Sequence, residues 1–509
     1  MSSANGRIVK NTGLLYFRLI FLTFINLYAV RVTFDALGDV DYGIFNVVAS
    51  VVASLSILTG AMTSATQRFL SFHLGRNDHE EYSRTFSLLL MSFLVLSAFL
   101  IVIGEILGYF FIEKWLNIPV DRISAAYWVF QASLVAFVFG LVTIPYTSSI
   151  IANERMDAFA LFSVVEGVMK LAIALWLVHF GGDRLILYGV LTAVTGICVF
   201  LMSMDFCHRK FRYCRYIWKW DRRIFMQLSG YTGWNLFGSV SGMLATQGQN
   251  ILLNIYFGPV VNAAKAIADR IQHVVYGFSI NLYMAVSPQI IKSYAAEDYQ
   301  RAISLVVKTS RMSFLLLFVL AFPLICNMDG LLALWLGDGS RSPDMISFSS
   351  LILVYCMILS LEPPISRIIQ ATGKIRNYQL SVGVITLSFI PVAVVLLSLG
   401  CGAVTTLLVL MAIMSLAQIV RVVVAHRQVG LDYRLYFHEV ILPIVRVMVV
   451  AVPLYMVFAD YSVTSDVFVV LVRTVVAAVS ALFMAGILGL SRNDRDMVRN
   501  IVMKKFRKN

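Results

Sequence analysis

The sequence predicts an all-α polytopic membrane protein with fourteen transmembrane helices: two six-helix lobes around a central cavity, plus two extra C-terminal helices. Composition is the first observation behind this prediction. Of the 509 residues, 59% are hydrophobic and 14% are charged, and the mean hydropathy is +0.81. Soluble domains have about 45–50% apolar and about 25% charged residues, so composition argues against a soluble protein. The other two observations are the apolar segments and an internal repeat.

Fourteen apolar segments reach the roughly 20 residues that a helix needs to cross a bilayer. Prolines in the fourth and tenth segments, Pro145, Pro363 and Pro364, predict breaks there, because proline removes a backbone donor. The first six segments lie at about 12–35, 42–62, 86–111, 125–151, 158–180 and 185–204. The other eight lie at about 228–256, 262–288, 303–326, 345–371, 377–399, 402–424, 437–458 and 467–490.

Basic residues alternate sharply from loop to loop. Most of them come after the even-numbered segments. Examples are Arg68, Arg421, the basic loop 205–227 and the tail 491–509. The positive-inside rule therefore predicts that both termini are cytoplasmic. Trp and Tyr beside Lys and Arg in CHRKFRYCRYIWKWDRR are typical of a membrane interface, so we expect no nucleic-acid partner. The other side has only Lys114, Arg122, Arg184, Lys265 and Arg341.

An internal repeat divides the chain. The stretch that starts LGDVDYGIFNVVAS at Leu37 aligns loosely with the stretch that starts FGPVVNAAKAIADR at Phe257, an offset of about 220 residues. Both copies have the same orientation in the membrane, so we expect a parallel repeat of two lobes. The predicted domains are an N-terminal lobe 1–204, a basic cytoplasmic loop 205–227, a C-terminal lobe 228–425, two extra helices in 426–490 and a basic cytoplasmic tail 491–509.

Polar residues on helices that face each other in such a repeat are the candidate substrate-binding residues. Arginine is the most informative type, because its planar fork pairs with carboxylate or phosphate oxygens. In the eighth segment, Lys265, Asp269, His273 and Tyr276 recur at helical spacing and predict one wet face. The candidates are Arg18 and Arg31 in the first segment, Gln247, Asn250 and Asn254 in the seventh, and Lys265, Asp269 and Arg270 in the eighth.

Structural roles compete with binding for each candidate. Arg18 could reach the cytoplasmic surface along its helix, and Arg31 could lie at the interface or between lobes. Asp269 and Arg270 could neutralise one another or their neighbours. Asp269 and His273 are also candidates for ion coupling, because His273 lies one turn away from Asp269 and histidine is a side chain that can exchange a proton at physiological pH; a hydrogen-bonded structural histidine is the alternative.

Other charged residues receive structural interpretations. Glu166 and Lys170 are four residues apart and predict an internal ion pair. Glu362 and Arg367 flank the Pro-Pro break and are candidates for a gate. Lys308, Arg311 and Arg473 lie near span ends, where long cationic side chains reach toward water.

No catalytic or metal-binding motif stands out. The chain has no G-x-x-x-x-G-K-[ST] loop and no H-E-x-x-H, and its six cysteines show no metal-ligand spacing. We therefore expect no enzyme activity, no metal, no other cofactor and no disulfide framework. The energy for any transport would come from an ion gradient or from the gradient of the substrate.

Three stretches carry a family resemblance: KNTGLLYFRLIFLTFINLYAVRVTFDALGDVDYGIFNVVASVV, GAMTSATQRFLSFHLGRND and IPYTSSIIANERMDAFAL. They resemble bacterial polysaccharide flippases of the O-antigen and capsule type, within the multidrug, oligosaccharidyl-lipid and polysaccharide (MOP) exporter superfamily. The resemblance is strongest from the N-terminus to the end of the third stretch and extends through the eighth segment.

The resemblance implies a two-lobed bundle in the bacterial cytoplasmic (inner) membrane. It implies alternating-access export of an undecaprenyl-pyrophosphate-linked oligosaccharide for lipopolysaccharide O-antigen or capsule synthesis. In similar lipid II flippases, arginines on helices one and eight bind the pyrophosphate, and Arg18 and Arg270 are on those helices here. Expected partners are this lipid-linked oligosaccharide, membrane lipids and glycan polymerase or assembly proteins. The alternatives are a cation-coupled multidrug exporter of the same fold and a non-transporting scaffold for glycan assembly.

Overall fold

The computed structural model describes residues 2–54, 57–110, 112, 119–217, 221–336, 342–460 and 467–490, which form helices joined by short connections, with no strand among them. Within this part of the chain, twelve helical stretches are long and apolar enough to cross a membrane. Two of the fourteen predicted spans, 42–62 and 228–256, are not among the twelve, but their described residues are helical. The structure confirms an all-α polytopic membrane protein and is compatible with fourteen spans. The predicted tail 491–509, Lys114 and Arg341 lie outside the described residues.

The chain forms two compact units. We call Met1–Ser239 with Ile291–Glu297 the N-terminal unit, and Val240–Ile290 with Asp298–Asn509 the C-terminal unit. The boundary between them falls inside a helix, α7 (Arg222–Phe257), whereas the sequence predicted a boundary in the loop 205–227. The preceding helix also runs on to Lys210, so the described connection is shorter than the predicted loop.

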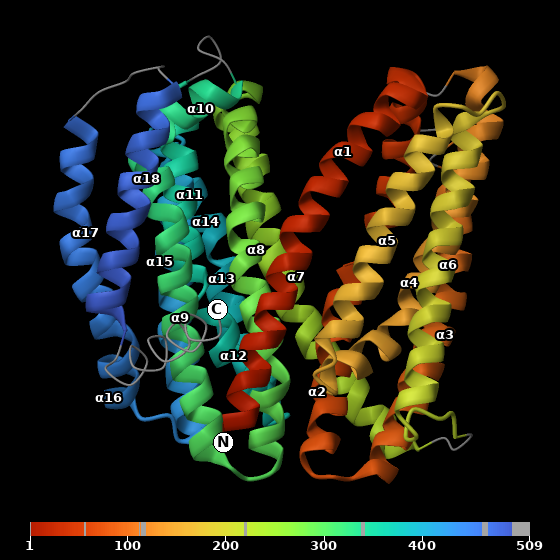
Figure 1. Ribbon diagram of the computed structural model, residues 1–509, viewed down its shortest axis with the longest axis horizontal. Helices are drawn as coiled ribbons and strands as arrows, with labels where there is room; N and C mark the ends of the chain where they lie inside the picture. Colours follow the sequence, from red (N-terminus) through yellow and green to blue (C-terminus); the bar gives the residue numbers. More distant parts are fainter. Residues whose placement is uncertain are drawn as a thin grey trace, which may run out of the picture. The chain divides into compact units, whose positions relative to one another are not determined.

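Six helices and the first half of α7 make up the N-terminal unit (Figure 1). One helix, α1, covers the first predicted span and runs into the second as far as Ser54, and the rest of the second span that is described belongs to α2. Helix α1 bends at Gly38, whose φ of 76° and ψ of 174° lie in a region open essentially to glycine alone. The helices are α1 (Ser2–Ser54), α2 (Ile57–Gly75), α3 (His79–Phe110), α4 (Ile123–Ala152, after the short helix η2, Val120–Arg122), α5 (Met156–Leu177) and α6 (Arg184–Lys210).

Helix α4 stays continuous through Pro145, so the predicted break there is wrong. A proline is tolerated inside a membrane helix where neighbouring helices support it. Helix α6 packs closely along α4, because a Cβ on Gly189 of α6 would lie 3.3 Å from the Cα of Val129. Beside Pro145, the Cys207 thiol of α6 donates to the Tyr146 carbonyl at 3.4 Å.

The C-terminal unit contains the rest of α7 and the later helices (Figure 1). The tenth predicted span is broken between α11 and α12, just before Pro363 and Pro364, as predicted. The eleventh is also broken, at Ser388, which the sequence did not predict. The helices are α8 (Pro259–Ala295), α9 (Tyr299–Cys326), α10 (Met328–Leu336), α11 (Pro343–Leu359), α12 (Glu362–Ala371), α13 (Arg376–Leu387), α14 (Phe389–Ser398), α15 (Thr405–Val429), α16 (Tyr433–Tyr436), η4 (Phe437–Ile441), α17 (Leu442–Asp460), α18 (Val467–Met484) and η5 (Ala485–Gly489).

The internal repeat is visible in the backbone. Gly38 and Gly258 occupy equivalent positions in the two copies, and their φ angles are 76° and 78°. Asn77 and Glu297 are related by the same offset, and their φ angles are 56° and 62° although neither is glycine. Positive φ is uncommon for residues other than glycine, so two such pairs at one offset support the predicted parallel repeat.

Helix caps repeat at the same offset. Asp78 accepts a hydrogen bond from the backbone N–H of Glu81 at 3.0 Å, and Asp298 accepts one from Arg301 at 3.1 Å. A carboxylate at this position satisfies a backbone donor that the first turn of a helix leaves free. Helices α3 and α9 therefore begin with the same local structure in the two copies.

Polar contacts connect helices at each of the two ends of the N-terminal unit. At the end where the chain starts, Asn11 of α1 donates to the carbonyl of Glu154 at 3.2 Å, and Lys292 pairs with the carboxylate of Glu154 at 2.6 Å. At the opposite end, Arg122 binds Asp41 at 2.8 Å and Asp183 at 2.9 Å. Burial raises the pKa of the Asp41 carboxyl, while Arg122 lowers it.

Candidate functional site

Arg18 lies inside the N-terminal unit, where α1 packs against α5. Its Nη1 donates to the Ser163 hydroxyl at 3.1 Å, and its guanidinium lies 4.7 Å from the centre of the Phe159 ring. Glu166 also interacts with it electrostatically. Because α1 begins at Ser2, ten residues before the predicted span, Arg18 lies roughly 24 Å along its helix. Its contacts are with α5, which argues against the alternative that it reaches the surface.

The predicted ion pair between Glu166 and Lys170 is confirmed, at 2.7 Å. Both side chains are more than a third exposed, so the pair borders open space. Together with Arg18 it forms a cluster of two cations and one anion on α1 and α5. The cluster therefore keeps one net positive charge that an anionic ligand could neutralise.

Arg31 is not part of this cluster. It lies thirteen residues beyond Arg18 on α1, about 20 Å farther along the helix, and its side chain is exposed. In the described part of the chain it has no ion-pair partner.

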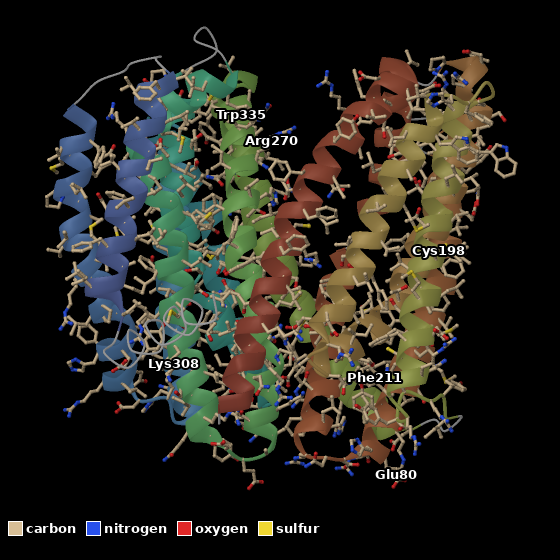
Figure 2. The ribbon with its side chains drawn as sticks, viewed as in Figure 1. Glu80, Cys198, Phe211, Arg270, Lys308 and Trp335 are labelled. Atoms are coloured by element: carbon tan, nitrogen blue, oxygen red, sulfur yellow. The ribbon has the colours of Figure 1, made fainter. Side chains whose placement is uncertain are left out.

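Helix α8 differs from the prediction of one wet face. Lys265 is only 5% exposed and bonds Asp269 at 2.5 Å, so this pair lies within the C-terminal unit. Asp269 is therefore neutralised by Lys265 rather than by Arg270. Among the charged and histidine side chains of this stretch, Arg270, labelled in Figure 2, and His273 are exposed. The face of α8 that the neighbouring helices leave exposed therefore differs from the wet face that the spacing of charges predicted.

The three amide candidates lie on one exposed face of α7. Gln247, Asn250 and Asn254 follow each other at intervals of three and four residues, and none of them is buried. Asn250 donates to the Gln247 carbonyl at 3.5 Å. The neighbouring Gln249 points the other way and donates to the Thr406 hydroxyl of α15 at 3.1 Å. This face offers several donors and acceptors of the kind that bind sugar hydroxyls.

Comparisons with known proteins agree with this architecture. Residues 243–397, from α7 to α14, match the model of the MatE family. An outward-facing multidrug resistance MATE transporter of the MOP superfamily has a TM-score of 0.71 at 12% identity, and the alignment covers 84% of this chain and 96% of that one. A MATE transporter in complex with MaD3S gives the same TM-score and coverage at 14% identity. This chain has the fold of MATE transporters.

A third similar structure of this fold is a MOP superfamily transporter from Pyrococcus furiosus. Its TM-score is 0.69 at 15% identity, with 84% of this chain and 96% of that chain covered. No curated protein sequence matches the chain significantly. At these identities the solved structures establish the MATE fold, and the choice of substrate depends on the residues of this chain.

Sequence reasoning missed a buried charge network in the C-terminal half of the MATE fold. Arg421 of α15 binds Glu362 of α12 at 3.0 Å and hydrogen-bonds Tyr378. Tyr276 and Tyr355 lie close enough to Glu362 to interact with it electrostatically. The available signal was the position of both charges inside apolar segments, 345–371 and 402–424.

Several cations assigned to loops or span ends are buried instead. Arg421 is 4% exposed and Arg68 is 7% exposed, so neither belongs to a cytoplasmic loop; the charge difference between the two sides persists without them. Arg311 is 2% exposed and binds the carboxylate and the carbonyl of Glu439 at 2.7 and 2.9 Å, so its predicted snorkelling is wrong. Lys308, one helical turn earlier, is exposed (Figure 2).

Arg367 does not stand alone beside the Pro-Pro break. Its Nε donates to the Tyr283 hydroxyl of α8, and its guanidinium lies 5.1 Å from the centre of that ring. Glu362 and Arg367, which the sequence suggested as a gate, thus make two separate contacts, one with α15 and one with α8. In the described residues, no group of three or more His, Cys, Asp or Glu is placed to hold a metal.

Proposed function

We propose that this chain is a membrane transporter that exports a lipid-linked oligosaccharide carrying a pyrophosphate across the cytoplasmic membrane by alternating access. The observation that supports this most directly is the charge of its exposed polar residues. Arg270 lies about 16 Å along α8, and neither it nor Arg31 has an ion-pair partner among the described residues. An unpaired cation at membrane depth is costly, so an anionic ligand would stabilise both.

In this proposal, Arg18 and Arg270 bind the pyrophosphate. Guanidinium groups pair two-to-two with phosphate oxygens and stay protonated at any physiological pH. Arg31 adds to the positive potential, while Lys265 and Asp269, four residues apart on α8, already neutralise each other. Gln247, Asn250 and Asn254 contact sugar hydroxyls. The lipid tail stays in the bilayer, where its transfer needs no polar path.

The MatE match and the MATE fold support transport as the general activity. They are equally compatible with a multidrug exporter, since one similar structure is described as a multidrug resistance transporter. The Pyrococcus furiosus transporter is described as having a binding pocket of reverse polarity that suggests a different function. Charge in the site can therefore differ between proteins of this fold, and here the exposed charges favour an anion over a cationic drug.

The test is transbilayer movement of an undecaprenyl-pyrophosphate-linked oligosaccharide in proteoliposomes. We expect Arg18→Ala and Arg270→Ala each to reduce the rate by about tenfold or more, because each removes a charge-assisted contact worth ~1.5–3 kcal/mol. Arg446→Ala is the matched control, since Arg446 is an exposed membrane arginine on α17 outside the proposed site.

Two results would contradict the proposal. Full transport by both site variants would show that Arg18 and Arg270 do not make the assigned phosphate contacts. Absence of transport by the wild type under proton and sodium gradients, together with export of cationic drugs in a susceptibility panel, would establish the multidrug alternative.

A further inference from the structure

A carboxylate lies on the apolar outer face of α3. Glu105 is exposed, and so are Ile101, Val102, Ile106 and Tyr109, which surround it at helical spacing. An exposed apolar face on a membrane-spanning helix contacts lipid. Glu105 lies five residues before the end of α3, about 7 Å along the helix, at the depth where hydrocarbon gives way to headgroups. A carboxylate at this level is stabilised by a polar partner from the protein or from a lipid headgroup.

Within the described residues, the protein supplies a neutral hydrogen-bond donor to Glu105 but no cation. Gln131 of α4 donates its Nε2 to Oε2 of Glu105 at 2.9 Å. The two helices meet closely here because Gly104 and Gly108 of α3 leave room for Leu134 and Phe130 of α4. Among the described residues Glu105 has no ion-pair partner, and a neutral amide cannot balance its charge.

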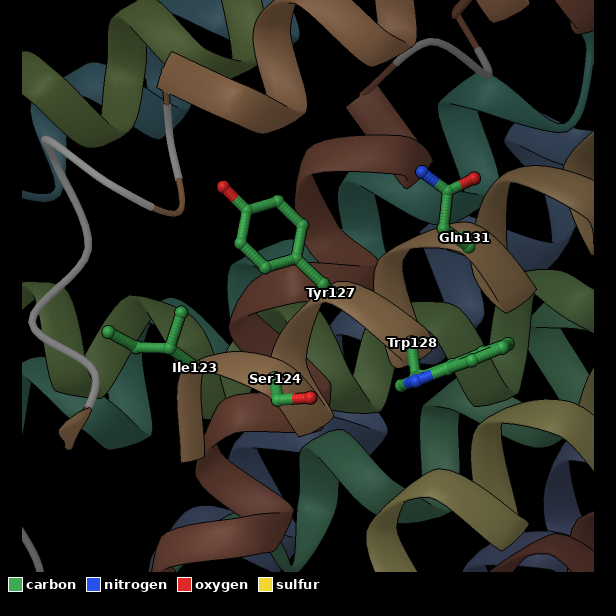
Figure 3. Close-up of a pocket in the computed structure, with 5 residues that line it drawn as sticks. All are labelled: Ile123, Ser124, Tyr127, Trp128 and Gln131. Carbon is green, nitrogen blue, oxygen red and sulfur yellow. The ribbon is translucent and has the colours of Figure 1, made fainter. Parts of the chain in front are cut away.

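A groove of about 490 Å³ lies beside Gln131, the residue that bonds Glu105. It is lined by Ile123, Ser124, Tyr127, Trp128 and Gln131, which project from the first turns of α4 (Figure 3). Gln131 belongs both to the groove and to the contact with Glu105. Trp128 is 57% exposed, and Trp and Tyr are the residues that favour the headgroup level of a membrane.

We propose that this groove and Glu105 bind the headgroup of phosphatidylethanolamine. The primary ammonium of this lipid donates hydrogen bonds to the Glu105 carboxylate and lies near the face of Trp128, which attracts a cation. The acyl chains run along the exposed apolar face of α3. Charge complementarity excludes an anionic headgroup, and a quaternary choline lacks the N–H donors that the carboxylate accepts.

The test measures lipid bound to the full chain in detergent micelles by native mass spectrometry. Phosphatidylethanolamine, phosphatidylcholine and phosphatidylglycerol are titrated separately. We expect phosphatidylethanolamine to bind about tenfold more tightly than the other two, as one charge-assisted hydrogen bond allows. Glu105→Gln should abolish that preference, and Trp128→Leu should weaken binding by about two- to fivefold.

Matched controls separate this site from general lipid binding. Glu80→Gln changes an exposed glutamate at the other end of α3, and Trp176→Leu changes an exposed tryptophan of α5 in the same unit. Both should keep the wild-type preference, and thermal unfolding without added lipid checks that every variant is folded. The proposal is overturned if the wild type binds the three lipids alike, if Glu105→Gln keeps the preference, or if Glu80→Gln loses it as well.

Discussion

The sequence patterns placed Arg311 near a span end and counted Arg421 among the basic loop residues, but both are buried inside the C-terminal unit. Each has a carboxylate partner from another helix, Glu439 for Arg311 and Glu362 for Arg421. A buried ion pair adds little net stability over apolar packing, but removing one partner leaves an uncompensated charge. Arg311 and Arg421 therefore pair with carboxylates of the protein, whereas the exposed Arg31 and Arg270 are available to a ligand.

Replacing Glu362 with Gln should destabilise the protein strongly. Arg421 would keep its charge and lose its carboxylate, at a cost of about 3 kcal/mol, the low end for a buried pair because Glu362 itself is partly exposed. The control is Glu80→Gln, which breaks an exposed pair with Arg84 and should cost less than about 1 kcal/mol. Thermal unfolding in detergent measures both, and equal losses would show that Arg421 does not depend on this contact.

At the scale of helices, close packing rather than hydrophobicity decides which elements lie together. Most spans are apolar all round, so their sequences do not specify neighbours. Close contacts at glycines specify the neighbours instead. A Cβ on Gly189 would lie 3.3 Å from Val129, and a Cβ on Gly167 would lie 2.5 Å from Leu22. These contacts join α4 to α6 and α1 to α5, and the second one positions Ser163 beside Arg18.

Replacing Gly189 with Leu should separate α4 from α6. The new side chain would meet the backbone of Val129, and overpacking of this kind costs about 1–3 kcal/mol. Gly140→Leu is the matched control: Gly140 lies in α4 with nothing within 4 Å of an added Cβ, so that substitution should be tolerated. A lower unfolding temperature for Gly189→Leu alone supports the packing, and similar temperatures for the two variants contradict it.

For the whole molecule, we predict orientation in the membrane from charge rather than from packing. In the sequence, the basic residues follow the even-numbered segments, and we expect the two repeat copies to share their orientation. The matching φ angles and helix caps show that the backbone, as well as the sequence, repeats at one offset. Both halves should therefore present their equivalent turns, 75–79 and 295–299, to the same side of the membrane.

Labelling of single cysteines in a cysteine-free background tests this orientation. A cysteine at Glu297, in the turn between α8 and α9, should be protected from an impermeant maleimide added outside intact cells. A cysteine at Gly181, in the turn between α5 and α6, should react, since it lies at the opposite end of the N-terminal unit. The reverse pattern would place the basic side outside and would contradict the positive-inside assignment.

The sequence by itself determined the class of protein, the approximate spans, the internal repeat and the helices that carry the candidate arginines. These follow from hydrophobicity, length and charge, which act locally along the chain. The i,i+4 spacing also predicted the Glu166–Lys170 pair. Only the tertiary structure decided which charges are buried and which pair between helices. Lys265 is buried, Arg421 binds Glu362 of another helix, and Pro145 leaves its helix intact. Burial and pairing between helices depend on contacts between distant segments, and no local pattern encodes them.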